Sequence, residues 1–322
     1  MIYAVTLNPC LDKTLTVPAW KSGDTVRGLE ARRVVGGKGN NVARALMRLG
    51  REVRPVTFFG GATGTFCSCL LQTQDGFTDR LTPMVTETKA ETRVILTVRT
   101  EGTGDQTAFF DPDPAIAPNE AKLFFRRLET AMKESDIDVL TLSGSSPSES
   151  THGLYAALIS LANEHGVPVF LDTYGPALAR IEAHWPTAIQ LNLREAGVYL
   201  GKSQPNEADC LGLLDRWIAQ GVEIATVTHG PDPAFVAIRG AKYRVQPPRI
   251  EPVNPIGSGD SMLAGFVDGR LSGLDAEALI RRAFGSAISN AMVWDAGAVD
   301  PAEVIRQGNL VRIESLGAVS DS

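Results

Sequence analysis

The segment from Val253 to Val267 holds the densest group of residues that could do chemistry. A turn at 257–259, Gly-Ser-Gly, runs directly into Asp260, and an apolar helical pattern follows from Met262. The glycines and the preceding proline disfavour a regular element before the acid, so we expect Asp260 to lie where a helix begins. Free backbone N–H groups at such a helix start, near the positive end of its dipole, hold negative charge, most often phosphate. The pattern suggests a general base in phosphoryl transfer; the alternative is an ordinary helix N-cap.

A second glycine-rich turn spans residues 36–41, with the sequence Gly-Gly-Lys-Gly-Asn-Asn, and leads into an apolar helical pattern that Gly50 ends. Glycines let the backbone approach a ligand closely. Lys38 could contact a phosphate there, and Asn40 and Asn41 could donate to sugar hydroxyls. The spacing satisfies neither a dinucleotide-binding fingerprint nor a Walker-type phosphate loop.

Strand and helix patterns alternate over most of the chain. We expect strands at 2–7, 53–59, 138–142, 167–172, 188–192 and 224–228, two hairpin-like strands at 234–239 and 242–245, and helices at 120–134, 151–165, 209–220, 261–271 and 276–293. This alternation predicts an α/β fold with a mostly parallel sheet covered by helices on both faces. No linker interrupts it, so residues 1–322 are expected to form one domain, with a loose tail after Leu316.

Two other stretches, roughly 14–35 and 86–111, have the short alternating patterns of β-strands. We expect them to form one small sheet that stands off the main domain as a lid. Arg93, in the alternating run from Thr86 to Thr100, could point into the cleft between lid and domain. The alternative is a solvated charge on an exposed strand face.

Several polar motifs follow predicted strands. They are Asp12, the turn at 143–147, Asn192 to Glu195, Thr228 to Gly230 and the turn at 257–260. In an open parallel sheet such strand ends meet along one edge, where ligands bind. Asn192 and Glu195 are three residues apart and share a helix face. Their oxygens suit Mg²⁺, usually through waters, although a capping Asn with a first-turn Glu is the alternative. Asp12 could equally be a turn residue.

The composition excludes several classes of function. The chain has 322 residues, a net charge of −6 and no basic run, which argues against a nucleic-acid partner. We expect no signal peptide and no membrane span. The four cysteines lack metal-ligand spacing and are expected to be reduced thiols in a cytoplasmic protein.

Three of these motifs together resemble a known family. Asn254 to Val267 resembles the C-terminal signature of the ribokinase-like phosphofructokinase B (PfkB) family, Gly36 to Arg44 its N-terminal signature, and Asn192-x-x-Glu195 its metal motif. The resemblance covers nearly the whole chain and implies a ribokinase-like three-layer α/β/α domain with a mostly parallel central sheet and a small β-sheet lid. The runs at 6–12 and 143–147 look like the hexose-phosphate branch, which includes 1-phosphofructokinase and tagatose-6-phosphate kinase.

The resemblance also implies residue roles. Asp260 would be the base, and Gly257, Ser258 and Gly259 would stabilise the transferring phosphoryl group. The acceptor sugar would bind Asp12, Gly37 and Asn41, and its phosphate would bind Lys38 and Arg93 with Ser145. The nucleotide would bind near Asn192, Thr228, Gly230, Ser286 and Asn290, with Asn192 and Glu195 acting on Mg²⁺ through waters. Gln190, Asn40 and His229 depart from the family pattern.

These roles imply ATP-dependent phosphorylation of fructose 1-phosphate, tagatose 6-phosphate or fructose 6-phosphate to a bisphosphate. Two alternatives stay open, a kinase of an unphosphorylated sugar or nucleoside and a non-catalytic sugar-phosphate sensor. Lys38 and Arg93 favour a phosphorylated acceptor, since two cations would be poorly used by a neutral sugar. The open edge of a lid strand and the family likeness together predict a homodimer through the lid.

Overall fold

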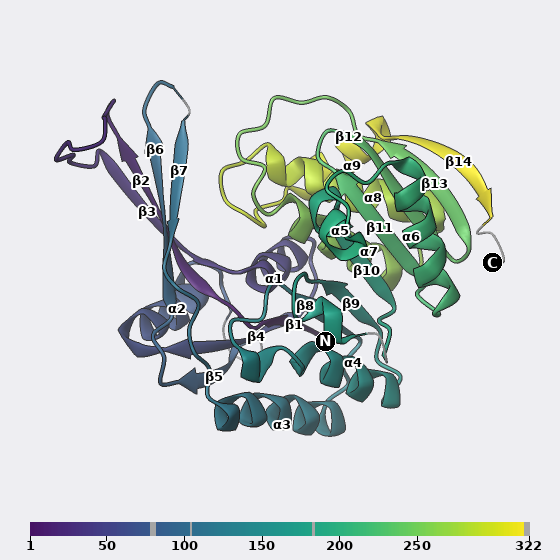
Figure 1. The fold of residues 1–322 in the computed structure, drawn as a ribbon, viewed down its shortest axis with the longest axis horizontal. Helices are drawn as coiled ribbons and strands as arrows, with labels where there is room; N and C mark the ends of the chain where they lie inside the picture. Colours follow the sequence, from purple (N-terminus) through teal and green to yellow (C-terminus); the bar gives the residue numbers. More distant parts are fainter. Residues whose placement is uncertain (78–81, 104, 182–183, 319–322) are drawn as a thin grey trace.

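The structure is a computed structural model that describes residues 1–77, 82–103, 105–181 and 184–318. Within them the strands form two sheets (Figure 1). In order across the main sheet, the strands are β14 (Arg312–Ala318), β13 (Ala241–Gln246), β12 (Asp232–Ile238), β11 (Ile224–His229), β10 (Ala188–Asn192), β9 (Val169–Asp172), β8 (Val139–Ser143), β1 (Ile2–Thr6), β4 (Val53–Gly60) and β5 (Met84–Thr88). From β5 to β11 neighbours are parallel, and β12 to β14 continue antiparallel.

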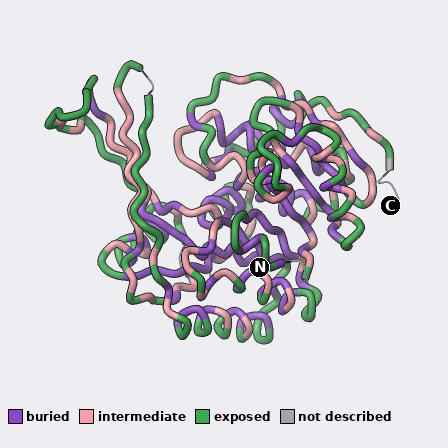
Figure 2. The backbone as a smooth tube through the Cα atoms, in the orientation of Figure 1, coloured by how far each residue is buried: buried purple, intermediate pink, exposed green. Residues whose placement is uncertain are grey.

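The central strands are apolar runs because both of their faces are covered. Every residue of β1, β8 and β9 is buried (Figure 2), as expected for a parallel sheet between two helix layers. Alternate residues of β1 enter different cores: Tyr3 and Val5 join one hydrophobic cluster, and Ile2 and Ala4 join the other.

Helices cover both faces of the sheet. The cluster around Tyr3 takes side chains from α3 (Pro118–Glu134), α4 (Leu154–Glu164), α5 (Leu193–Leu200) and α6 (Glu207–Ala219). The cluster around Ile2 takes them from α1 (Lys38–Arg48), α2 (Gly61–Thr73), α7 (Ser258–Leu271), α8 (Ala276–Ala291) and α9 (Pro301–Leu310). The predicted three-layer α/β/α domain is therefore confirmed.

The smaller sheet has the order β3 (Glu30–Gly36), β2 (Cys10–Val17), β6 (Arg93–Thr100) and β7 (Gln106–Phe110). It rises away from the main body at the left of Figure 1, as the predicted lid sheet should. Two details differ from the sequence-based expectation. Asp12 lies within β2, not in a turn after β1. The run from Thr86 to Thr100 is split, because Met84–Thr88 pairs with β4 at the edge of the main sheet.

Three elements were not expected from the sequence. Helix α2 begins at Gly61 in a stretch that reads as a glycine turn, and α9 and β14 follow the last predicted helix. The expectation of a loose tail after Leu316 is wrong as far as Ala318, because β14 pairs with β13 up to that residue. Residues 319–322 lie outside the described part of the chain. All four cysteines are free thiols. Among the described helices, none has the length and apolar character needed to cross a membrane.

Candidate active site

The turn at 257–259 opens α7 and puts Asp260 in the first helical turn. Gly257 is the N-cap, with φ 83°, and no side chain caps the helix. A Cβ on Gly257 would meet the Cβ of Ala296 at 2.6 Å, so both backbone angle and space require glycine. Asp260 is therefore not the N-cap. The Ser258 amide donates to the carbonyl oxygen of Pro255 at 3.2 Å, and among the described residues the next two amides, of Gly259 and Asp260, have no recorded partner, so they can donate to an anion at the helix start.

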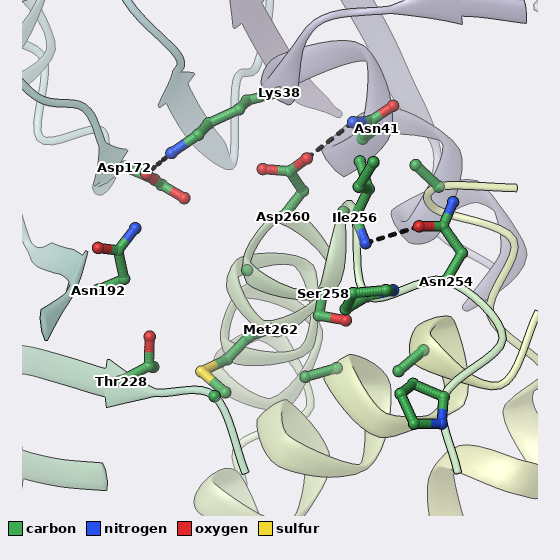
Figure 3. Close-up of a pocket in the computed structure, with 18 of the residues that line it drawn as sticks. Lys38, Asn41, Asp172, Asn192, Thr228, Asn254, Ile256, Ser258, Asp260 and Met262 are labelled. Carbon is green, nitrogen blue, oxygen red and sulfur yellow. Dashed lines mark hydrogen bonds and ion pairs between the residues drawn. The ribbon is translucent and has the colours of Figure 1, made fainter. Parts of the chain in front are cut away.

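Asp260 is 4% exposed, and its Oδ2 accepts a hydrogen bond from Asn41 Nδ2 at 2.8 Å (Figure 3). Burial and the negative charge of Asp172 raise the pKa of the Asp260 carboxyl to about 7. The Lys38 charge and the Asn41 hydrogen bond oppose this rise only in part. A carboxyl group with a pKa near neutrality suits general-base catalysis.

The Lys38 side chain extends from α1 to the side of Asp260 opposite Asn41 (Figure 3). Its Nζ lies 2.8 Å from Asp172 Oδ1 and 3.3 Å from Glu195 Oε1. Burial alone would lower the pKa of the Lys38 ammonium, but Asp172, Glu195 and Asp260 outweigh this and raise it. Lys38 therefore stays protonated beside Asp260.

Asp172 was not singled out from the sequence, although its position at the predicted end of a strand was a usable signal. Gln190 Nε2 donates to Asp172 Oδ2 at 3.2 Å and to the carbonyl oxygen of Gly259 at 2.9 Å. The amide thus connects the acid at the end of β9 to the start of α7. Gln190 is one of the three residues that depart from the family pattern.

Asn192 and Glu195 form a helix cap, which was the alternative to metal binding. Asn192 Oδ1 accepts from the Glu195 amide at 2.9 Å, and Glu195 Oε2 accepts from the Asn192 amide at 3.0 Å. The other carboxylate oxygen of Glu195 lies against Lys38 in the cavity. In the described residues, no three His, Cys, Asp or Glu side chains converge to hold a bare metal ion. Carboxylate and amide oxygens at the cavity wall do fit a Mg²⁺ ion that keeps its waters.

A second polar cluster lies where the lid meets the main domain. Arg93 on β6 forms an ion pair with Asp113 at 2.8 Å, and its side chain is 14% exposed, so it is not a solvated charge. Asn8 Nδ2 donates to Asp113 Oδ1 at 2.9 Å and to Ser145 Oγ at 3.0 Å. Neither Asn8 nor Asp113 was assigned a role from the sequence. For Asn8 there was a usable signal, because it directly follows the strand predicted at 2–7, whereas Asp113 stands in no glycine-rich or strand-end motif.

Asp12 faces the same space from β2. Burial raises the pKa of its carboxyl to about 6, and the charge of Arg44, a hydrogen bond from the Cys10 thiol and the charge of Arg93 oppose the rise. Asp12 is thus a partly buried acceptor at the lid side, whereas Asp260 lies on the main-domain side.

A cavity of about 910 Å³ joins these groups. Of the residues selected from the sequence, those lining it are Asp12, Gly37, Lys38, Asn41, Arg93, Ser145, Asn192, Glu195, Thr228, Gly230, Gly257, Ser258, Gly259 and Asp260. That size accommodates a drug-sized or nucleotide-sized ligand.

Ser286 and Asn290 are placed differently. Both are buried in α8, which contributes Phe284, Ala287, Ile288 and Ala291 to the described cavity lining in their place. Asn290 Nδ2 donates to the carbonyl oxygen of Ile256 at 2.9 Å and so supports the loop before α7.

Two of the residues that depart from the family pattern also face away from the cavity. Asn40 is fully buried, and its Nδ2 donates to the carbonyl oxygen of Gly36 at 2.9 Å. His229 lines a separate, smaller cavity of about 350 Å³. Neither residue belongs to the described lining of the larger cavity.

Comparison of the sequence with models of known protein families identifies the family of this chain. Residues 5–304 match the model of the pfkB family carbohydrate kinases. The chain belongs to the pfkB family. As a pfkB-family carbohydrate kinase it is a phosphotransferase, and the predicted family and enzyme class are confirmed.

Solved structures of phosphofructokinases have the same fold as this chain. Phosphofructokinase-2 from Escherichia coli superimposes with a TM-score of 0.86 at 25% identity, covering 96% of this chain and 98% of that one. A putative phosphofructokinase from Staphylococcus aureus gives a TM-score of 0.81 at 25% identity, covering 99% and 100%. A possible 1-phosphofructokinase from Thermotoga maritima shares the fold, with a TM-score of 0.87 at 24% identity, covering 98% and 99%.

Proposed function

We propose that this pfkB-family protein transfers the γ-phosphoryl group of ATP to a hydroxyl of a phosphorylated ketohexose, giving a bisphosphate. The acceptors it fits are fructose 1-phosphate, tagatose 6-phosphate and fructose 6-phosphate. The observation that carries the proposal is the buried carboxyl of Asp260 at the start of α7, hydrogen-bonded to Asn41 and flanked by the Lys38 ammonium.

Asp260 acts as the general base. Asn41 donates to Oδ2, which leaves the other carboxylate oxygen to take the proton of the acceptor hydroxyl. As that proton leaves, the oxygen attacks the γ-phosphorus and the bond to ADP breaks. The Gly259 and Asp260 amides, together with the dipole of α7, stabilise the negative charge on the group in transfer.

Lys38 is better placed for the transferring phosphoryl group than for the phosphate already on the sugar. Its ammonium lies among Asp172, Glu195 and Asp260, on the opposite side of Asp260 from Asn41 (Figure 3). A protonated lysine beside the base can neutralise charge that develops during transfer. We therefore propose this role for Lys38, in place of the acceptor-phosphate contact expected from the sequence.

The cluster of Arg93, Ser145 and Asn8 is proposed to hold the acceptor's phosphate. Arg93 supplies a planar cation suited to bidentate phosphate contacts. Ser145 supplies a hydroxyl donor, because its Oγ accepts from Asn8 and its own hydrogen stays free. Asn8 orients Ser145, since its amide already donates to Asp113 and to Ser145. Asp12, Gly37 and Asn41 line the space between this cluster and Asp260 and would contact the sugar hydroxyls.

The nucleotide is proposed to occupy the end of the cavity lined by Thr228, Gly230 and the α8 residues Ala287 and Ile288. Asn192 and Glu195 would hold a hydrated Mg²⁺. When bound, that ion shields the charge between the nucleotide phosphates.

Relatives support a phosphorylated acceptor. Phosphofructokinase-2 from Escherichia coli has been solved in complex with fructose-6-phosphate, and that structure is 25% identical to this chain with a TM-score of 0.82. A neutral sugar or nucleoside would leave Arg93 paired with Asp113 alone and would make no use of its charge. A non-catalytic sensor would have no use for a carboxyl group whose pKa is raised to about 7.

One assay separates the three functions. ADP release is measured with ATP and Mg²⁺ over a panel of fructose 1-phosphate, fructose 6-phosphate, tagatose 6-phosphate, fructose and ribose. We expect turnover with at least one phosphorylated ketohexose, and Asp260→Asn should lose most of it, with roughly 10²–10⁴-fold attributable to general-base catalysis. Tight calorimetric binding of a sugar phosphate without turnover would support the sensor. Turnover with fructose or ribose alone would support a kinase of unphosphorylated sugars.

We also propose that two copies pair through their lids. Strand β7 lies at one edge of the small sheet, with Phe109 and Phe110 exposed by 53% and 63%. An apolar open edge of this kind favours pairing with a second chain. Sedimentation velocity should report a dimer that Phe109→Asp weakens, and a wild-type monomer would contradict the proposal.

A further inference from the structure

Arg44 lies in α1 close behind Asn41, and its guanidinium is almost completely enclosed, with 6% of the residue exposed. It forms a bidentate pair with Asp75, from Nε to Oδ1 and from Nη2 to Oδ2, both at 2.9 Å. Three further contacts complete its shell: Asn41 Oδ1 at 3.1 Å, the carbonyl oxygen of Ala296 at 2.7 Å and that of Val35 at 2.9 Å. None of the functions described above uses this group.

The contact with Asn41 fixes the orientation of an amide that touches the proposed base. A guanidinium only donates hydrogen bonds, so the Asn41 atom that faces Arg44 must be the carbonyl oxygen. The Asn41 amino group then faces Asp260, and it donates to Oδ2 at 2.8 Å. If the amide turned over, its oxygen would face the Asp260 carboxylate and repel it.

The same guanidinium also determines where the turn at 257–259 lies relative to Asn41. Arg44 Nη1 holds Ala296 by its carbonyl oxygen. Gly257 packs so closely on Ala296 that a Cβ there would approach the Ala296 Cβ to 2.6 Å. Asn41 and the turn that opens α7 are therefore both located against Arg44, from two segments far apart in the sequence.

We propose that Arg44, held by Asp75, is a positioning residue for phosphoryl transfer: through Asn41 it orients Asp260, and through Ala296 it locates the start of α7. The inference rests on the proposed role of Asp260 as the base. Arg44 acts through other residues, so its loss should change kcat more than the KM for ATP.

The pH dependence of kcat separates this role from a purely structural one. The groups facing Asp260 are Asp172 on β9, Lys38 on α1 and Glu195 on α5, together with the Asn41 amide. The Asn41 hydrogen bond lowers the pKa of Asp260, whereas the Asp172 charge and burial raise it. Freeing the Asn41 amide, with the three charged groups unchanged, should move the rising limb of the profile to higher pH.

The experiment compares Arg44→Met and Asp75→Asn with Arg51→Met. Arg51 is a matched control, because its Nε also pairs with an aspartate carboxylate, that of Asp268 at 2.7 Å, but it has no recorded contact with Asn41. Thermal unfolding, kcat, the KM for each substrate and the pH profile of kcat are measured for each variant.

We expect Arg44→Met to lower kcat by roughly 10- to 100-fold, the range that follows from misplacing a reacting group by about 1 Å. Its profile should shift to higher pH, and Asp75→Asn should do the same to a smaller degree. Arg51→Met should lower the unfolding temperature and leave kcat and the profile unchanged. Should Arg44→Met fail to fold, Asp75→Asn decides the question by the same two readouts.

The outcomes also separate this inference from the function on which it rests. If Asp260→Asn abolishes turnover while folded Arg44→Met or, failing that, Asp75→Asn keeps both kcat and the pH midpoint, the positioning role is wrong and the base stands. If Asp260→Asn keeps its activity, the proposed function itself fails.

Discussion

Lys38 and Asp172 form an ion pair of 2.8 Å between the start of α1 and the end of β9. Lys38 lies on a helix and Asp172 is the last residue of an interior strand of the main sheet, and Asp260 lies beside the pair (Figure 3). The ammonium is thus held in place by carboxylates. A cation that is fixed before a substrate binds contributes most to charge stabilisation in catalysis, which supports the role proposed for Lys38.

Replacing Lys38 with methionine should lower kcat by roughly 10²–10³-fold, the cost typical of losing one preorganised charge-stabilising donor. The Lys38 charge also lowers the pKa of Asp260, so the apparent pKa in the kcat profile should rise. Lys202→Met is the control, because Lys202 pairs with Asp209 outside the described cavity lining. A large rise in the KM of phosphorylated acceptors with kcat preserved would instead assign Lys38 to the acceptor's phosphate.

The pH dependence of the reaction follows from Asp260 and Asp12. The proposed base, Asp260, must be ionised to act. Burial and the Asp172 charge raise the pKa of Asp260 to about 7, so kcat should rise with pH up to about that value.

Burial also raises the pKa of Asp12 to about 6. The ratio kcat/KM for the sugar should therefore fall more steeply than kcat below about pH 6. Because the pKa of Lys38 is raised, its deprotonation should give no falling limb near neutral pH. Steady-state rates measured against pH at constant ionic strength test both the rise in kcat and the expected absence of a fall near neutral pH. A flat kcat profile through pH 7 would contradict the assignment of Asp260.

The glycine turns and strand ends predicted many of the residues that line the cavity, because their backbone requirements are local in the sequence. The turn at 257–259, Lys38 and Glu195 each stand in a motif whose backbone requirement is visible in the residues themselves. What joins them is not local: Lys38 and Asp172 are separated by 134 positions, and so the pair could not be derived from spacing. The same holds for the contact between Asn8 and Asp113, 105 positions apart.

The fold was predicted where the apolar pattern was strong and missed where glycine or polar residues obscured it. The fully buried strands β1, β8 and β9 follow from their composition. Helix α2 carries two glycines and three threonines in its 13 residues and few buried ones, so tertiary packing rather than propensity decides it. Asn290 was expected at the nucleotide, but its amide is taken up by the loop before α7, and no sequence pattern distinguishes these two roles.

Arg93→Ala should raise the KM of the phosphorylated acceptor and change kcat much less. Losing a charged hydrogen-bonding partner costs binding about 1.5–3 kcal/mol, roughly 10- to 100-fold in KM. Arg33→Ala is the lid control, since Arg33 is exposed on β3, an edge strand of the same sheet, and lies outside the described cavity lining. An unphosphorylated sugar tested beside the phosphorylated one should show little change. An equal loss for both sugars would mean that Arg93 supports the lid rather than the phosphate.

Asp260→Asn should stabilise the protein at alkaline pH while it abolishes activity. The folded-state pKa of Asp260 is raised from 3.8 to about 7, so the folded chain binds this proton more tightly than the unfolded chain. Between those two pH values the folded state carries more protons, and its stability falls as pH rises through the window. The loss is complete above about pH 7, and at about 1.4 kcal/mol per pKa unit it is on the order of a few kcal/mol.

The Asn side chain has the shape of Asp but carries no charge to bury, and its amide oxygen can accept the hydrogen bond from Asn41. We therefore expect Asp260→Asn to unfold at a higher temperature than the wild type at pH 8 and at about the same temperature near pH 4. Asp268→Asn gives the contrasting case: Asp268 is equally buried but pairs with Arg51 and Arg282, and removing its charge should destabilise the fold. Thermal unfolding of the three proteins at both pH values tests this. A wild type at least as stable as Asp260→Asn at pH 8 would show that the site holds the Asp260 carboxylate without cost, contrary to the raised pKa.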